Sequence, residues 1–80
     1  MDILKAFGKA VKLRRVELDL SQEDLAGRTG LARSFISGME RGETAASVRS
    51  IGQLATALEC QPSDLWLVAE RLMQSKSSGA

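Results

Sequence analysis

The segment from Ser21 to Glu40 constrains the fold of this chain more than any other part of the sequence. Its pattern predicts two short helices joined by a tight turn, within the residues SQEDLAGRTGLARSFISGME. Ser21 is an N-cap candidate with Asp24 three residues on, although Asp is shorter than the usual Glu or Gln, so the capping box is expected to be imperfect. Ala26 allows a second helix to cross closely. Gly30 stands where a chain leaving a helix often needs positive φ.

Four residues of this segment have the spacing of a helix-turn-helix motif, whose second helix enters the major groove of DNA. They are Gln22, Ala26, Gly30 and Ile36. The segment resembles the Cro and phage-repressor family of helix-turn-helix proteins, also called the XRE family. The likeness covers about residues 7–67 and includes Arg14-Arg15 before the motif, Glu40-Arg41-Gly42 after it and the later QPSDL. It implies an all-α fold, a compact five-helix bundle of the lambda-repressor-like type.

Apolar residues at helical spacing, together with capping signals, predict where the five helices lie. We expect them at about residues 2–18, 22–28, 33–40, 48–58 and 62–73. Ser47 is expected to cap the fourth helix and Pro62 to open the fifth. Inward-facing residues are expected to include Ile3, Leu4, Phe7, Val11, Leu18 and Val48, with Ala10 and Leu13 as further candidates. Residues 1–74 are expected to form one DNA-binding and dimerisation domain, followed by a disordered polar tail at 75–80.

Size and composition exclude several classes of protein. The 80 residues contain no histidine and one cysteine, Cys60, so Ser-His or Cys-His catalysis, a zinc cluster and an intrachain disulfide have no residues to build them. No stretch approaches the ~20 apolar residues of a membrane helix, and the N-terminus lacks the form of a signal peptide. We therefore expect a cytoplasmic protein that is not an enzyme and uses no metal, cofactor, membrane or small-molecule substrate.

The net charge of +1 is low for a protein that binds nucleic acid. Positive charge is concentrated before residue 50, where nine Lys or Arg face seven Asp or Glu. This balance predicts modest non-specific affinity for DNA and a strong dependence on base contacts. Lys5, Lys9 and Lys12 form a basic stripe that is either a solvated helix face or lies near the phosphate backbone.

The resemblance assigns base reading to the first turns of the second motif helix. Matched onto this sequence, the base-reading residues are Ala32, Arg33, Ser34 and Ser37. Arginine can donate two hydrogen bonds to guanine, the commonest specific contact, although Arg33 could also be a solvated side chain. Phe35 either touches a thymine methyl group or covers the core, and we favour partial burial. Gly38 has no side chain that could reach a base, so it either lets the helix approach closely or narrows the readout of bases.

The DNA backbone is expected to be contacted from two places. Gln22 stands at a helix N-terminus, where free N–H groups favour phosphate. The resemblance adds the loop after the recognition helix, so the predicted phosphate contacts are Gln22, Arg41, Thr44 and Arg49. Glu43 departs from the family's pattern of basic residues, which weakens the case for tight DNA binding through this loop. Arg15 and Glu40 occupy the positions of a family ion pair between the first helix and the end of the third.

The last helix carries more apolar residues than one face can bury. Leu65, Val68 and Leu72 form one stripe, which we assign to the core. A second stripe, assigned to a homodimer interface, consists of Trp66, Ala69 and Met73. The alternative is that Trp66 packs onto its own core. A two-fold dimer would match half-sites ~34 Å apart.

These patterns predict a regulator of transcription that binds a palindromic or pseudo-palindromic double-stranded DNA operator as a homodimer. Restriction–modification controllers and phage or plasmid repressors are the free-standing relatives of this size, and the SFISGMERG segment resembles controllers most. The rival interpretation is an antitoxin or another protein-interaction module of the same fold. The low net charge and Gly38 favour that rival.

Overall fold

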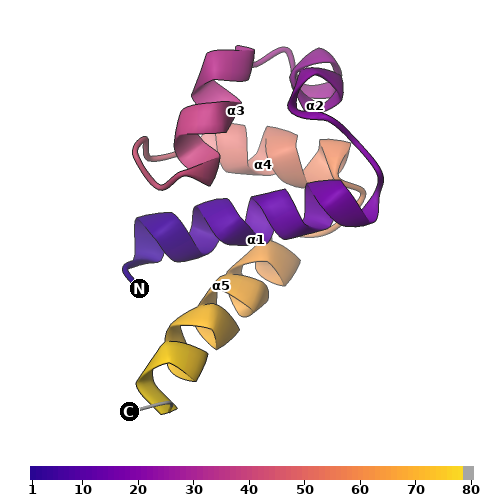
Figure 1. The fold of residues 1–80 in the computed structure, drawn as a ribbon. Helices are drawn as coiled ribbons and strands as arrows, with labels where there is room; N and C mark the ends of the chain where they lie inside the picture. The colour runs from indigo at the N-terminus through magenta and orange to yellow at the C-terminus, as the bar shows by residue number, and fades with distance from the viewer. Residues whose placement is uncertain (79–80) are drawn as a thin grey trace.

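The computed structural model describes the backbone of residues 1–78 and the side chains of residues 1–74. Over this range the chain forms five helices, which are α1 (Ile3–Glu17), α2 (Gln22–Thr29), α3 (Arg33–Glu40), α4 (Val48–Ala57) and α5 (Pro62–Ser78) (Figure 1). The first four lie within one or two residues of their predicted bounds. None of the described helices is both long enough and apolar enough to cross a membrane.

Helix α5 is longer than the sequence analysis predicts. It continues to Ser78, whereas an end near Met73 was expected. The polar residues after Gln74 were assigned to a disordered tail, but they include neither proline nor glycine before Gly79 and so contain no residue that must end a helix. Of that tail, residues 79 and 80 lie outside the described residues.

The N-termini of α1, α2 and α4 are closed by short polar side chains. Asp2 accepts a hydrogen bond from the Lys5 N–H, and Ser47 caps α4 as predicted. At α2 the capping box is complete, because the Ser21 hydroxyl accepts from the Asp24 N–H and the Asp24 carboxylate accepts from the Ser21 N–H, both at 2.9 Å. The expectation of an imperfect box was therefore wrong. The hydrogen bond from the Ser21 backbone lowers the pKa of Asp24.

Three helices end in the same backbone motif, with a residue in the left-handed region after the C-cap and two hydrogen bonds back into the last turn. At the end of α3 that residue is Gly42, with φ +75°. At the ends of α1 and α4 it is Asp19 and Glu59, with φ 59° and 56°. Gly30 leaves α2 at φ 76°, which confirms the positive φ predicted for the turn.

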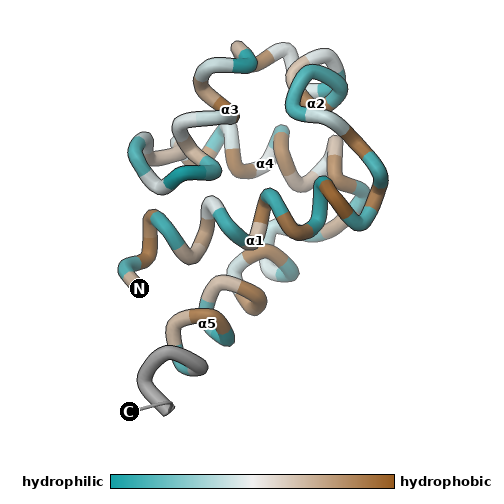
Figure 2. Tube along the Cα trace, in the orientation of Figure 1, coloured by the Kyte–Doolittle hydropathy of each residue, from teal (hydrophilic) through white to brown (hydrophobic). Residues whose placement is uncertain are grey.

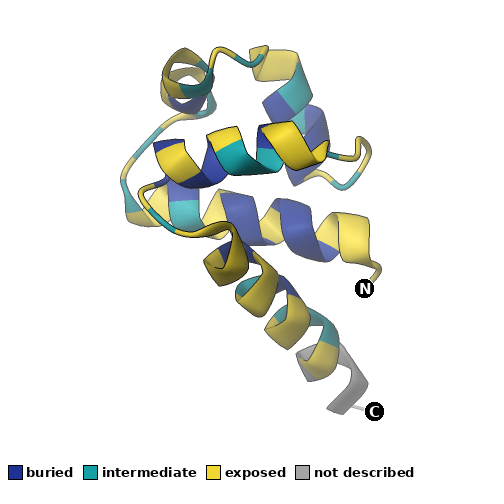
Figure 3. Cartoon of the chain, turned by 180° about the vertical axis from the view of Figure 1, so that it is seen from behind, coloured by how far each residue is buried: buried dark blue, intermediate teal, exposed yellow. Residues whose placement is uncertain are grey.

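The core lies where α1 is covered by α3 and α5 and where α4 packs against α2 and α5 (Figures 1 and 2). Its largest fully buried side chains are Val11, Leu25, Ile36, Met39, Leu54, Leu58 and Leu65. The middle of α1 is buried, but its first turn is exposed (Figure 3).

Several apolar residues predicted to face inward do not. Ile3, Leu4 and Leu13 are each more than two-fifths exposed, and Val48 is 89% exposed. Val48 is the first residue of α4, before that helix reaches the core. Leu13 faces solvent because the last turns of α1 bury Arg15 against α3 instead.

Two glycines mark where α1 touches the end of α3, and the sequence analysis singled out neither for packing. A β carbon built at Gly8 would lie 2.1 Å from the carbonyl oxygen of Met39 and 2.9 Å from that of Glu40. One at Gly42 would lie 2.8 Å from the Cα of Lys5. By contrast, Gly52 in α4 has nothing within 4 Å of such a carbon, so no close helix contact requires it.

Candidate nucleic-acid interface

The outward face of α3 is set by its buried residues. Ile36 and Met39 are fully buried and fix the rotation of the helix, which leaves Arg33 and Ser34 exposed and Ser37 half-buried. Ala32 is the N-cap and makes no side-chain cap bond. Phe35 is half-buried against the core, as favoured. The predicted base-reading residues therefore lie at the first turns of α3, toward solvent.

Arg33, Ser37 and Arg41 are spaced four residues apart and so follow one side of α3. The Nε of Arg33 lies 3.9 Å from a Glu23 carboxylate oxygen on α2, with 61% and 80% of the two side chains exposed. Ion pairs this exposed contribute at most about 1 kcal/mol, so Arg33 can exchange Glu23 for another acceptor.

Arg41 is held by two neighbours. Its Nη1 donates to the Ser37 hydroxyl and its Nη2 donates to Glu43 Oε1 at 3.0 Å. The hydrogen bond from Arg41 lowers the pKa of Glu43. A predicted phosphate contact and a predicted base-reading residue are thus joined in one cluster.

Arg15 and Glu40 form a bidentate ion pair beneath this face. Arg15 Nε donates to Glu40 Oε2 at 2.8 Å and Nη2 donates to Oε1 at 3.0 Å, with side-chain exposures of 11% and 3%. Arg15 Nη1 also donates to the Leu20 carbonyl at 2.8 Å. The hydrogen bond to Glu40 raises the pKa of Arg15. The pair fastens the C-terminal end of α3 to α1.

Gln22 lies where the motif predicts, at the N-terminus of α2, but its amide is engaged. Its Nε2 donates to Glu40 Oε1 at 3.0 Å, so it belongs to the Arg15–Glu40 network. The sequence analysis expected Gln22 to face phosphate and missed this bond, which joins residues 18 positions apart.

The remaining predicted phosphate contacts are Thr44, in the loop after α3, and Arg49, in the first turn of α4. Both are exposed. Gly38 is buried, and a β carbon there would lie 3.0 Å from Thr44 Oγ1. Gly38 therefore packs against this loop, a role that the sequence analysis did not consider, and both roles that it did consider stay predictions.

Comparison with known proteins identifies the family. A family model described as helix-turn-helix matches residues 11–65, more than half of the chain. The chain belongs to the helix-turn-helix family of XRE type. Control protein C.BamHI of Bacillus amyloliquefaciens is 40% identical to it over 60 residues, which are 74% of each chain.

Solved structures of controllers share the fold of this helix-turn-helix protein. The restriction-modification controller C.AhdI from Aeromonas hydrophila matches with a TM-score of 0.76 and 44% identity, over 78% of this chain and 94% of that one. The controller C.Esp1396I, solved as a tetramer in complex with its natural 35-base-pair operator, matches with a TM-score of 0.80 and 27% identity over 89% and 93% of the two chains. The protein is thus homologous to restriction–modification controllers.

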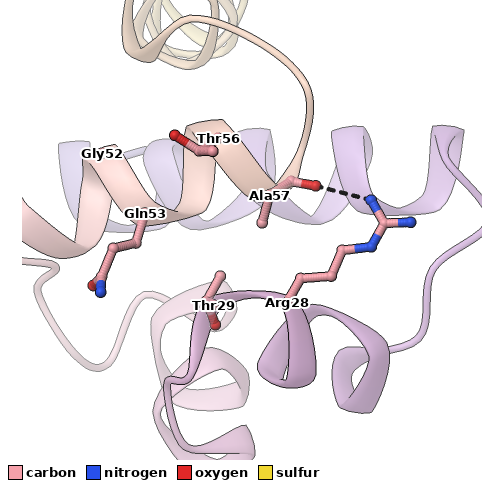
Figure 4. A pocket seen from close by; sticks show the side chains of 6 residues that line it. All are labelled: Arg28, Thr29, Gly52, Gln53, Thr56 and Ala57. Carbon is pink, nitrogen blue, oxygen red and sulfur yellow. Dashed lines mark hydrogen bonds between the residues drawn. The ribbon is translucent and has the colours of Figure 1, made fainter.

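Two further arginines, Arg14 on α1 and Arg28 on α2, help to position the motif and are not candidate base readers. Arg14 Nε donates to the Leu58 carbonyl at 3.0 Å, and Arg28 Nη1 donates to the Ala57 carbonyl at 3.1 Å (Figure 4). Both therefore satisfy carbonyls at the C-terminal end of α4, beyond those that accept from the backbone N–H groups of Glu59 and Cys60. They were missed because each joins residues far apart in the sequence, which leaves no local signal.

Proposed function

We propose that this protein regulates transcription by binding operator DNA as a homodimer, and that it controls a restriction–modification system. The observation that carries the proposal is the exposed N-terminal half of α3. A buried ion pair between Arg15 and Glu40 holds the other end of this helix against α1. The homology to controllers supports it, because one of them was solved on its operator.

The contacts of the basic residues support recognition by placed contacts rather than by a general positive field. Arg15 is buried in an ion pair, while Arg14 and Arg28 bind backbone carbonyls. With a formal net charge of +1, the chain as a whole has little excess positive charge to attract phosphate from a distance. Arg33 is then the long donor best placed for a base.

Replacing Arg33 by alanine should weaken operator binding by ~1–3 kcal/mol and relax the preference at one base pair per half-site. The reason is that Ser34 and Ser37 are too short to replace it. The operator would first be selected from random DNA with the parent protein, and both proteins would then be titrated against it and against a scrambled sequence.

Arg71→Ala is the matched control, because Arg71 is an exposed arginine on α5. It should leave the operator preference unchanged. Equal losses of Arg33→Ala on operator and scrambled DNA would make Arg33 a backbone contact instead of a base reader.

The predicted dimer interface needs one correction. Ala69 has no exposed surface, because it packs in the chain's own core between α5 and α1. Trp66 is 38% exposed and rests on Phe7, with ring centroids 4.7 Å apart. Met73 is half-buried against the core. Trp66 therefore packs on the core of its own chain and still exposes apolar surface to solvent.

The exposed apolar surface around Trp66 extends onto the first turn of α1. Ile3 and Leu4 are 43% and 42% exposed and line one apolar groove together with Trp66 and Phe7. Contiguous apolar surface of this kind marks interaction sites. We place the homodimer contact here, with a second copy of the chain as the occupant.

Ile3→Glu should shift the protein from dimer to monomer by about tenfold or more in dissociation constant, because it would bury a charge in the interface. The control is Val48→Glu. Both positions are the first residue of a helix, but Val48 lies outside the groove. Sedimentation without DNA measures the change. If the Ile3→Glu variant had the same dimer dissociation constant as Val48→Glu, the dimer interface would lie elsewhere on the molecule.

A further inference from the structure

The backbone at Glu43 is fixed by the end of α3 and is not a free loop. Its N–H donates to the Gly38 carbonyl at 2.9 Å, and the Gly42 N–H donates to the Met39 carbonyl at 3.0 Å. Gly42 adopts φ +75° with its Cα facing the backbone of Lys5 on α1. The direction in which the Glu43 side chain leaves the chain is therefore set by α3 and α1 together.

The Glu43 carboxylate lies at the end of the row formed by Arg33, Ser37 and Arg41. The guanidinium of Arg41 donates backward to Ser37 and forward to Glu43. These contacts use one N–H from each terminal nitrogen and hold the planar group along α3. Without Glu43, only the hydrogen bond to the Ser37 hydroxyl among the contacts described for Arg41 would oppose its turning outward toward a phosphate.

We infer that Glu43 is a positioning residue that directs Arg41 toward Ser37, and so toward the bases, and away from the DNA phosphates. The inference rests on the proposed function and replaces the sequence-based assignment of Arg41 as a phosphate contact. It also gives a role to the acidic residue that departs from the family's pattern in this loop.

Both side chains are accessible to DNA, since 56% of Arg41 and 62% of Glu43 is exposed. A carboxylate and a phosphate compete for the same donors, so Arg41 gains little by exchanging one for the other. Non-specific DNA offers mainly phosphates. Glu43 therefore lowers affinity for non-specific DNA more than affinity for an operator whose bases meet the Ser37–Arg41 cluster.

The experiment compares Glu43→Gln, Arg41→Ala and the double variant on selected operator and scrambled DNA at two salt concentrations. Glu43→Gln should strengthen binding to scrambled DNA by about three- to tenfold and add about one to the salt slope there. Operator affinity should change less, so the specificity ratio falls. In the Arg41→Ala background this gain should disappear, and Arg41→Ala alone should weaken operator binding more than scrambled binding.

Glu70→Gln on α5 controls for the loss of one negative charge and should leave both affinities nearly unchanged. A gain for Glu43→Gln that is equal on both DNAs, or that survives in the Arg41→Ala background, would mean that Glu43 only repels phosphate and would overturn the inference. No change on either DNA would also overturn it. A parent protein that selects no sequence at all would instead reject the proposed function.

Discussion

Replacing Gly8 by alanine is expected to destabilise the protein by about 3 kcal/mol or more, at the upper end of the cost of overpacking. The added methyl carbon would stand 2.1 Å from the Met39 carbonyl oxygen, well inside any real contact. That atom belongs to the backbone, so relief requires α1 and α3 to move apart. Alanine's better helix propensity returns at most about 1 kcal/mol.

Gly52→Ala provides a control with the opposite expected sign. Gly52 is also in the middle of a helix, but a β carbon there meets open space. This variant should gain up to about 1 kcal/mol. Urea unfolding of both variants measures the difference. If Gly8→Ala were as stable as Gly52→Ala, the two helices would not approach as closely as described.

Removing either member of the Arg15–Glu40 pair is expected to cost about 3–5 kcal/mol. Each partner is almost fully buried, so its removal strands the other charge away from water. Loss of Glu40 also removes the acceptor of the Gln22 amide. A domain of this size has only about 5–15 kcal/mol of stability, so the single variants should be largely unfolded under mild denaturing conditions.

The double variant should cost less than the sum of the two single changes, because no unpaired charge remains. Thermal or urea unfolding of the parent, Arg15→Ala, Glu40→Ala and the double variant completes the cycle. The exposed Glu23–Arg33 pair serves as the comparison, with an expected coupling below about 1 kcal/mol. Additive costs at Arg15 and Glu40 would show that the two side chains do not interact.

The helices were predictable because their signals are local. Ser21, Gly30 and Ser47 each act on backbone groups within a few residues, so their types alone indicate where a helix begins or ends. Asp19 and Glu59 show the limit of such signals. Both residues take the left-handed conformation that glycine favours, and their residue types alone do not predict it.

The contacts that position the site were only partly predictable. The Arg15–Glu40 pair was expected from the family resemblance, whereas the bonds of Arg14 and Arg28 to α4 depend on how distant helices cross. Gly8 was overlooked because an apolar stripe is recognised from its side chains, and glycine has no side chain. Ala69 was misplaced because helical spacing does not reveal which of two apolar faces the chain itself covers.

Helix α1 contacts the end of α3 and the residues that follow it at three points, which are Gly8, Arg15 and the contact of Lys5 with Gly42. Because its C-terminal end is held in this way, tilting or sliding the recognition helix would break these contacts. Adaptation to unlike half-sites must then come from side-chain rotamers and from bending of the DNA. Operators would therefore be ranked partly by the flexibility of base steps that the protein never touches.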